Sequence, residues 1–165
     1  MILILHNILS VYNVGSIFRT ADAAGVEKIF LTGYTPTPID RFGRVRPDLS
    51  KVALGAEKSV AWEQVKNPYG AIKKLRDAGC DIVAIEQDAR SQNLFTYAQL
   101  LQKKTSKQKK SAKPLALMLG NEVRGISKAM LAKCDVIVEI PMHGKKESLN
   151  VSVTAGIALF ALRGK

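Results

Sequence analysis

Short runs rich in isoleucine, leucine and valine recur along the chain, separated by segments with apolar residues at helical spacing. An apolar run of about four to eight residues predicts a buried β-strand, whereas apolar positions three and four residues apart predict an amphipathic helix. The predicted strands are 2–5, 28–33, 80–87, 114–120 and 135–141. The predicted helices are 15–25, 67–79, 94–102, 127–134 and a last one from about Ser148 or Asn150 to Leu162. This alternation predicts an α/β fold with a mostly parallel sheet and helices on both faces.

Residues 34–56 do not fit the alternation. Prolines and glycines interrupt this stretch, and no hydrophobic period persists through it. We therefore expect an irregular loop, and a loop of this length in a compact domain indicates a functional role. Ligands of parallel α/β sheets bind beyond the carboxyl ends of the strands, so the loops that follow the predicted strands are expected to hold the site.

The size and composition predict one folded domain, since the chain has 165 residues of which 47% are hydrophobic. Its longest apolar stretch, 151–162, is shorter than the roughly 20 residues of a membrane span, and no basic segment precedes the first apolar run as in a secretory signal. We expect a cytoplasmic protein. Cys80 and Cys134 have neither metal-ligand spacing nor the density of a disulfide framework, so they are expected to be buried, reduced thiols.

Basic residues are in excess, with a net charge of +11, and this favours a polyanionic partner such as nucleic acid. The stretch 103–113 holds six lysines and no acidic residue. It is expected to be a flexible, solvated insertion that either contacts phosphates or only keeps the chain soluble. A second group, Arg41, Arg44 and Arg46, lies in the irregular loop and offers planar guanidinium groups suited to phosphate.

The stretch "GNEVRGIS", residues 120–127, has the glycine spacing of a phosphate-binding P-loop, but Ile126 stands where that loop needs lysine. Glu122 would repel a phosphate, so a nucleoside-triphosphate site is not expected. No G-x-G-x-x-G, no zinc-type cluster of histidine and cysteine and no G-x-S-x-G motif occurs. His143, in a loop, is the one histidine considered for acid–base chemistry, although an exposed loop histidine is the simpler interpretation.

Three stretches read together, "NVGSIFRTADAAGV" (13–26), "LMLGNEVRGIS" (117–127) and "IPMHGKKESLNVSVTAGIALF" (140–160), resemble the signature motifs of the SpoU, or TrmH, family of RNA ribose 2′-O-methyltransferases. Residues 51–60 are similar to the family's segment between the first two motifs. The resemblance covers nearly the whole chain; the 103–113 stretch resembles an insertion, and the RNA-binding extensions of many members have no counterpart in this sequence. It implies a parallel α/β fold with a C-terminal trefoil knot and a homodimer with active sites at its interface. No metal is expected, because the sequence has no metal-ligand pattern of histidine and cysteine.

The same resemblance implies that S-adenosylmethionine binds in the knotted loops. The positions that match the family's cofactor contacts are Leu119, Gly120, Asn121, Ile140, Met142, Ser148 and Leu149, with Ile85 and Glu86 after the preceding strand. Apolar side chains and backbone amides suit a flat adenine ring.

The resemblance also places Arg19 at the reacting ribose, surrounded by Asn13, Glu122, Ser148 and Asn150. Because arginine has a very high pKa, we expect Arg19 to bind the phosphate of the target nucleotide and to orient the hydroxyl rather than to act as a base. Glu122 is expected to orient Asn13, Arg19 or a neighbouring amide, with an ion pair to Arg124 or a lysine as the alternative. Ser148 and Asn150 could each cap the last helix.

Two other functions stay open. One is a non-catalytic RNA-binding protein on the same fold, and the other is a methyltransferase of this fold that acts on a non-RNA substrate. The substrate could be transfer or ribosomal RNA, and compactness with family analogy slightly favours transfer RNA.

Overall fold

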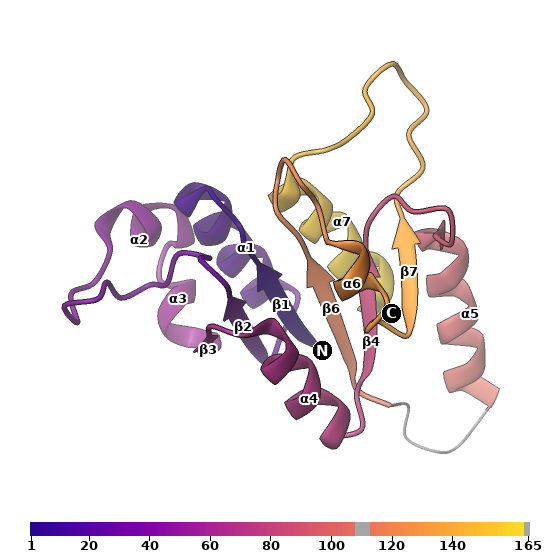
Figure 1. Ribbon diagram of the computed structural model, residues 1–165, viewed down its shortest axis with the longest axis horizontal. Helices are drawn as coiled ribbons and strands as arrows, with labels where there is room; N and C mark the ends of the chain where they lie inside the picture. Colours follow the sequence, from indigo (N-terminus) through magenta and orange to yellow (C-terminus); the bar gives the residue numbers. More distant parts are fainter. Residues whose placement is uncertain (108–112, 164–165) are drawn as a thin grey trace.

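A computed structural model describes residues 1–107 and 113–163 of the protein. These residues form a seven-stranded, wholly parallel sheet with helices packed against it (Figure 1). The strands are β1 Ile2–His6, β2 Lys28–Thr32, β3 Ala61–Val65, β4 Asp81–Ile85, β5 Gln92–Asn93, β6 Leu115–Leu119 and β7 Val136–Glu139. Their order is β3-β2-β1-β6-β4-β7-β5, and every neighbouring pair is parallel. The carboxyl ends of all strands therefore lie along one edge of the sheet.

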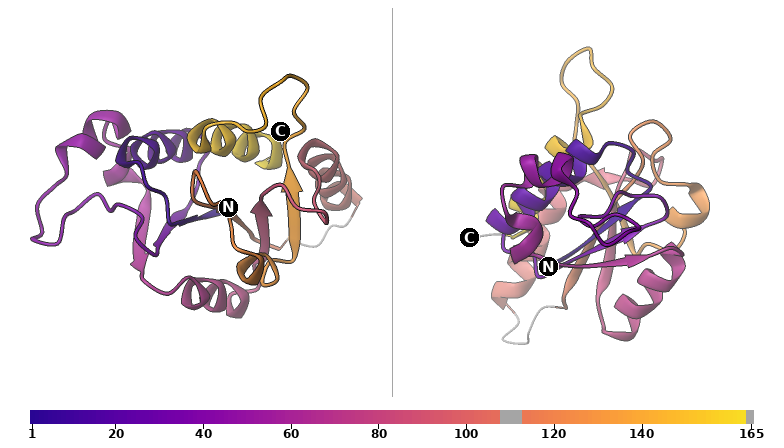
Figure 2. Two further views of the ribbon diagram at one scale, coloured as in Figure 1. Left: turned by 45° about the horizontal axis from the view of Figure 1, so that its top comes forward. Right: turned by 90° about the vertical axis from the view of Figure 1, so that its left-hand side faces the viewer.

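Helices cover both faces of the sheet, as the alternation predicts (Figure 2). The helices are α1 Val11–Ala23, α2 Pro47–Ala53, α3 Ala56–Ser59, α4 Pro68–Asp77, α5 Leu94–Lys107, α6 Lys128–Leu131 and α7 Val151–Arg163. Successive residues of a strand point to opposite faces. Leu117 of β6 packs in a core cluster with residues of α1, α2, α5 and α7, whereas Met118 packs in a second cluster with residues of α4 and α6.

The prediction for residues 34–56 was wrong in its second half, which folds into α2 and the start of α3. Pro47 occupies the first turn of α2, where its fixed φ favours helix and its missing N–H costs nothing. Leu49 is fully buried, and the α2 backbone approaches α1 so closely that a Cβ at Gly15 would lie 2.7 Å from the Leu49 carbonyl oxygen. Tertiary packing against α1 therefore stabilises a helix too short to show a hydrophobic period.

Two strands, β3 and β5, were not predicted. The side chains of β3 are half-buried or exposed because it is an edge strand, and β5 has two exposed residues. Neither forms the continuous apolar run that marks a strand buried on both faces.

The predicted flexible insertion 103–113 is wrong at its beginning, since α5 extends through Lys107. Leu94 and Ala98 anchor the helix in the core, and lysine and glutamine continue it readily because they are good helix formers. The remaining predicted insertion residues include 108–112, which lie outside the described part of the chain. The trefoil knot stays a prediction.

Candidate functional site

A cavity of about 460 Å³ lies at the carboxyl edge of the sheet, between the loops that follow β4, β6 and β7. This volume is within the range of about 300–1,000 Å³ that is usual for small-molecule and cofactor sites. All nine residues that the family resemblance assigns to the cofactor line it: Ile85, Glu86, Leu119, Gly120, Asn121, Ile140, Met142, Ser148 and Leu149. The fold thus gathers residues from three separate stretches around one space.

The loop after β6 has a defined shape because Asn121 and Glu86 brace it. Asn121 is only 7% exposed; its Oδ1 accepts from the amides of Val123 and Arg124, and its Nδ2 donates to the Asn7 carbonyl and to the Tyr34 hydroxyl. These bonds use both amide hydrogens of Asn121, so its side chain has no donor left for a ligand.

Glu86 fastens the far end of the same loop, where its Oε2 accepts from the Ile126 amide at 2.7 Å. The carboxylate comes so close to Gly125 that a Cβ there would lie 2.3 Å from Oε2, and Gly125 has a positive φ of 63°. Glycine is therefore required at this position, and Glu86 shapes the cavity wall as well as lining it.

The lining of the cavity is acidic. Glu86, Glu122 and Glu139 are among the lining residues, whereas no lysine, arginine or histidine from residues 1–107 or 113–163 is. Apolar side chains, including Leu119, Ile140 and Met142, make up much of the rest. Such a surface suits a ligand with an apolar part and a positive charge, and it disfavours phosphate groups.

Three of the residues predicted to surround the reacting ribose form one hydrogen-bonded network. Glu122 accepts from the Leu9 amide (2.8 Å), the Ser10 amide (3.1 Å) and Asn13 Nδ2 (2.9 Å). The Oδ1 of Asn13 accepts in turn from Asn150 Nδ2 at 3.1 Å. The network joins the loop after β6 to the amino ends of α1 and α7.

The charge of Glu122 is favoured by these contacts. Partial burial opposes ionisation, but the hydrogen bonds from Leu9, Asn13 and Ser10 outweigh it and hold the pKa of Glu122 below its usual value. Among the described residues Glu122 forms no ion pair with Arg124 or a lysine. Of the alternatives for Glu122, the structure therefore favours the orientation of Asn13 and of neighbouring amides.

Asn150 caps the last helix as well as joining the network. Its Oδ1 accepts from the Ser152 amide at 2.8 Å and from the Ser152 hydroxyl at 2.7 Å, which satisfies donors at the beginning of α7. Ser148 lines the cavity two residues earlier. Of the two residues considered as caps, Asn150 is the one that bonds to the helix.

Arg19 is not part of this network. It is exposed on α1, about 9 Å along the helix axis from Asn13, and among the described residues it makes no hydrogen bond with Asn13, Glu122 or Asn150. Tyr12 and Arg19 are seven residues apart, so they share one exposed stripe of α1. Within one chain, therefore, Arg19 is not surrounded by the other predicted catalytic residues.

Two of the three loop arginines are paired with carboxylates. Arg44 Nη2 lies 2.9 Å from Asp40 and Arg46 Nη2 lies 3.0 Å from Asp48. No carboxylate in the described part of the chain forms an ion pair with Arg41. The loop thus carries less free positive charge than its sequence indicates.

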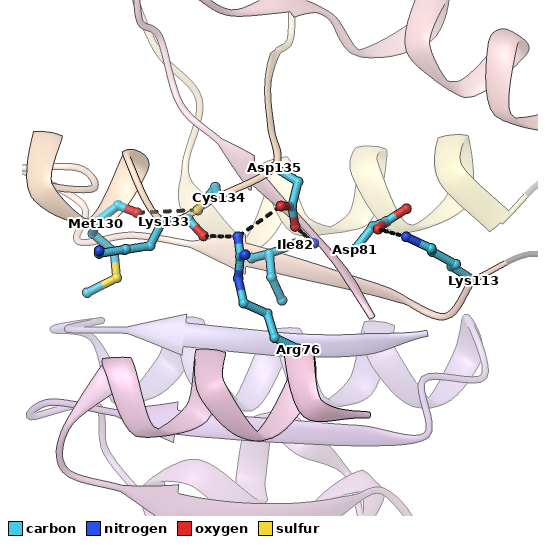
Figure 3. Close-up of polar contacts among 8 residues, drawn as sticks. All are labelled: Arg76, Asp81, Ile82, Lys113, Met130, Lys133, Cys134 and Asp135. Carbon is cyan, nitrogen blue, oxygen red and sulfur yellow. Dashed lines mark hydrogen bonds and ion pairs between the residues drawn. The ribbon is translucent and has the colours of Figure 1, made fainter. Parts of the chain in front are cut away.

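A second polar cluster lies at the amino edge of the sheet, away from the cavity (Figure 3). Arg76 of α4 donates to the Lys133 carbonyl at 2.9 Å and to Asp135 at 2.8 Å, and Asp135 also accepts from the Ile82 amide. Burial raises the pKa of the neighbouring Cys134 thiol to about 11, so the thiol is not a ready nucleophile. This cluster braces α4 against the turn before β7.

His143 is exposed and does not line the cavity. Gln87, Glu139 and Thr154 line the cavity but were missed by sequence reasoning. Gln87 is the last residue of the predicted strand 80–87, and Glu139 lies near the end of the predicted strand 135–141 and is the last residue of β7. The rule that ligands bind at the carboxyl ends of strands could therefore have identified both. Among the described residues there is no group of three or more histidine, cysteine, aspartate or glutamate side chains that could hold a metal ion. No helix in the same residues is both long and apolar enough to cross a membrane.

The fold and the cavity define a parallel α/β protein with a ligand site at the carboxyl ends of its central strands. Residues 1–160 match the model of the SpoU rRNA Methylase family. The chain belongs to this family, as its three motifs indicate.

Named relatives show the same relationship. The chain is 34% identical over 161 residues to an "Uncharacterized tRNA/rRNA methyltransferase" of Archaeoglobus fulgidus, covering 98% of this chain and 63% of the relative. It is 31% identical over 160 residues to a 23S rRNA (guanosine-2′-O-)-methyltransferase of Ralstonia nicotianae, covering 97% and 57%. The chain therefore spans less than two thirds of the length of these curated relatives.

Solved structures confirm the fold. An AdoMet-bound rRNA methyltransferase from Sinorhizobium meliloti superposes with a TM-score of 0.81 at 28% identity, covering 98% of this chain and 55% of that one. The A. aeolicus TrmH/SpoU tRNA modifying enzyme superposes with a TM-score of 0.77 at 28% identity, covering 98% and 73%.

Proposed function

We propose that this protein methylates a ribose 2′-hydroxyl of structured RNA and takes the methyl group from S-adenosylmethionine. The observation that carries the proposal is the acidic, partly apolar cavity next to the Asn13–Glu122–Asn150 network. Family membership and relatives named as RNA methyltransferases support it. We also propose that the chain is a single methyltransferase domain located in the cytoplasm.

The residues of the cavity fit S-adenosylmethionine. The cofactor carries a sulfonium and an ammonium group against one carboxylate, so its net charge is positive, and Glu86, Glu122 and Glu139 offer the complementary charge. Leu119, Ile140 and the remaining apolar side chains offer a surface for its adenine ring. A nucleoside triphosphate, by contrast, would meet three carboxylates in the cavity and no cationic side chain from the described residues.

Bound S-adenosylmethionine supplies a methyl group on a positively charged sulfur, which leaves as a neutral thioether and needs no acid. The protein must place the ribose oxygen in line with that group and allow its proton to depart. Asn13 and Asn150, whose orientations Glu122 controls, form the polar wall at which the ribose is positioned. Arg19 binds the target phosphate, and the proton leaves through that phosphate or through water.

We propose that the protein acts as a homodimer, because Arg19 is not at the cavity of its own chain. Figure 2 shows α1 and α7 side by side on one face of the sheet, and both helices carry exposed side chains, Tyr12 and Arg19 on α1 and Val153 and Phe160 on α7. Groups of exposed apolar residues mark protein interfaces. In a two-fold symmetric dimer the same face of each subunit contacts that of the other. A second copy seated there would bring its own Arg19 toward the site.

The test is transfer of labelled methyl from S-adenosylmethionine into unmodified transfer and ribosomal RNA, followed by digestion to locate the label on ribose or base. The preference for transfer RNA stays a prediction, and the curated relative from Ralstonia nicotianae is named for 23S rRNA, so both RNAs are needed. We expect label on ribose in one RNA class. Cofactor binding without label in any RNA would favour a non-RNA substrate, and absence of cofactor binding would favour a non-catalytic RNA-binding protein.

Arginine variants test the phosphate role. Arg19→Ala and Arg19→Lys are expected to abolish turnover while S-adenosylmethionine still binds, because a lysine cannot form the bidentate contact of a guanidinium. Arg90→Ala is the matched control, since Arg90 is exposed and does not line the cavity. A lysine variant with near-normal rate would contradict the bidentate role.

A further inference from the structure

Residues 39–45 form a well-defined hairpin that projects at the left end of the molecule in Figure 1. Ile39 pairs with Val45, and the Arg46 amide donates to the Pro38 carbonyl at 2.9 Å. The Asp40 carboxylate accepts from the amides of Phe42 (2.8 Å) and Arg44 (3.0 Å). Gly43 turns the chain with a φ of 79°.

The tip of this hairpin presents an aromatic ring to solvent. Phe42 is 65% exposed, and the guanidinium carbons of Arg41 and Arg44 lie 4.7 and 5.0 Å from its ring centroid. Asp40 fixes Arg44 in turn, with Arg44 Nε 2.9 Å from Oδ2. Cation–π contacts therefore hold the ring in place outside the hydrophobic core. The ring does not contribute to the packing of the core, so its exposure suggests a role in binding.

Of the three positive charges near the ring, one has no carboxylate partner in the described part of the chain. Asp40 and Asp48 neutralise Arg44 and Arg46, whereas Arg41 forms no ion pair within residues 1–107 and 113–163. The hairpin thus combines an aromatic ring that is 65% exposed with one guanidinium, that of Arg41, which has no carboxylate partner among the described residues. An unpaired nucleotide has the complementary pair of features, a flat base and a phosphate, and paired bases are buried in their own stack.

We infer that Phe42 stacks on an unpaired nucleobase of the substrate RNA while Arg41 contacts a neighbouring phosphate. The inference rests on the proposed function, which makes RNA the substrate, and it adds that the RNA offers a single-stranded nucleotide to this hairpin. The hairpin lies outside the cavity, so this contact selects the RNA and does not take part in the methyl transfer.

The experiment measures fluorescence anisotropy of a labelled single-stranded oligoribonucleotide and of an RNA duplex of the same length, without cofactor. Phe42→Leu keeps an apolar side chain but removes the aromatic plane, and it is expected to raise the Kd for the single strand about 5- to 100-fold. Phe42→Trp is expected to bind at least as tightly as the wild type. Phe95→Leu is the matched control, because Phe95 is 45% exposed on α5, at the other end of the molecule in Figure 1.

Salt dependence separates the two contacts. Arg41→Ala is expected to lower the slope of log K against log salt by about 0.7, the value for one phosphate of a single strand, whereas Phe42→Leu leaves the slope unchanged. The inference is overturned if Phe42→Leu binds the single strand as Phe95→Leu does, if both RNAs lose affinity equally, or if the wild type prefers an acidic peptide. Because no methyl transfer enters this assay, failure of the proposed catalysis is detected separately by the labelled-methyl experiment.

Discussion

Replacement of Glu122 by glutamine tests whether this residue organises the site. Its Oε2 accepts one hydrogen bond, from the Leu9 amide, and its Oε1 accepts two, from the Ser10 amide and Asn13 Nδ2. In Glu122→Gln the amide oxygen is expected to stay on the side of Ser10 and Asn13, which turns the NH₂ group toward the Leu9 N–H. One charge-assisted bond is then lost and two become neutral.

The magnitude follows from those bonds. A hydrogen bond to a charged group contributes about 1.5–3 kcal/mol, and the partial exposure of Glu122 reduces this. We expect Glu122→Gln to lower the free energy of unfolding by about 1–2 kcal/mol at pH 7, which corresponds to a fall in Tm of about 2–8 °C for a chain of this size. Methyl transfer should fall as well, since a neutral hydrogen bond holds Asn13, and through it Asn150, less firmly than the charge-assisted one.

The pH dependence gives the sharper test. Because the pKa of Glu122 is lowered in the folded state, its charge stabilises the fold above the unfolded value of about 4.5, and this stability is lost as pH falls through the folded pKa. Urea unfolding should therefore show a difference between wild type and Glu122→Gln at neutral pH that disappears in acid. Glu147→Gln is the control, since no side-chain hydrogen bond of Glu147 is recorded in the described chain. A loss independent of pH, or no loss, would refute the reasoning.

Two other predictions concern the cavity and the dimer. A Cβ at Gly120 would lie 2.5 Å from Ile126 Cγ1 and 2.7 Å from the Gly125 carbonyl carbon, so Gly120→Ala should distort the loop and weaken S-adenosylmethionine binding at least tenfold in calorimetry; unchanged affinity would show that the loop can shift freely. Phe160, 57% exposed on α7, should lie in the proposed dimer interface. Phe160→Glu is expected to give monomers in analytical ultracentrifugation and to lose methyl transfer, whereas a dimer that persists would place the interface elsewhere.

The central strands could be predicted because both faces of each are buried. β1, β4 and β6 are flanked by helices on both sides, so nearly every position is apolar and the runs stand out in the sequence. β3 lies at an edge and carries Glu63, whose pKa is lowered mainly by its hydrogen bond with Lys28 and which therefore needs solvent and cations around it. A strand at the edge of the sheet has no continuous apolar run, and which strand lies at the edge depends on the order of all seven strands. The position of β3 therefore could not be predicted from its own residues.

The candidate site divides in the same way. Most of the cavity-lining residues could be named because they follow buried strands and match family motifs, both local features of the sequence. Pairing of Arg44 with Asp40 and of Arg46 with Asp48 depends on the turn geometry of the hairpin, although all four residues are neighbours in the sequence. In the proposed dimer, the position of Arg19 relative to the cavity depends on the second copy, so it could not follow from the sequence pattern of one chain.

The orientation of Asn13 shows how distant motifs act together. Its two amide atoms could be exchanged without a change of shape, but the exchange would set its oxygen against the Glu122 carboxylate and its NH₂ against the Asn150 NH₂. The negative charge of Glu122 therefore determines the orientation of Asn13, and Asn13 determines that of Asn150, whose own oxygen then faces the amide of Ser152. A single carboxylate between two glycines thus sets the direction of the polar groups from β6 to α7, which is why each motif alone describes only part of the site.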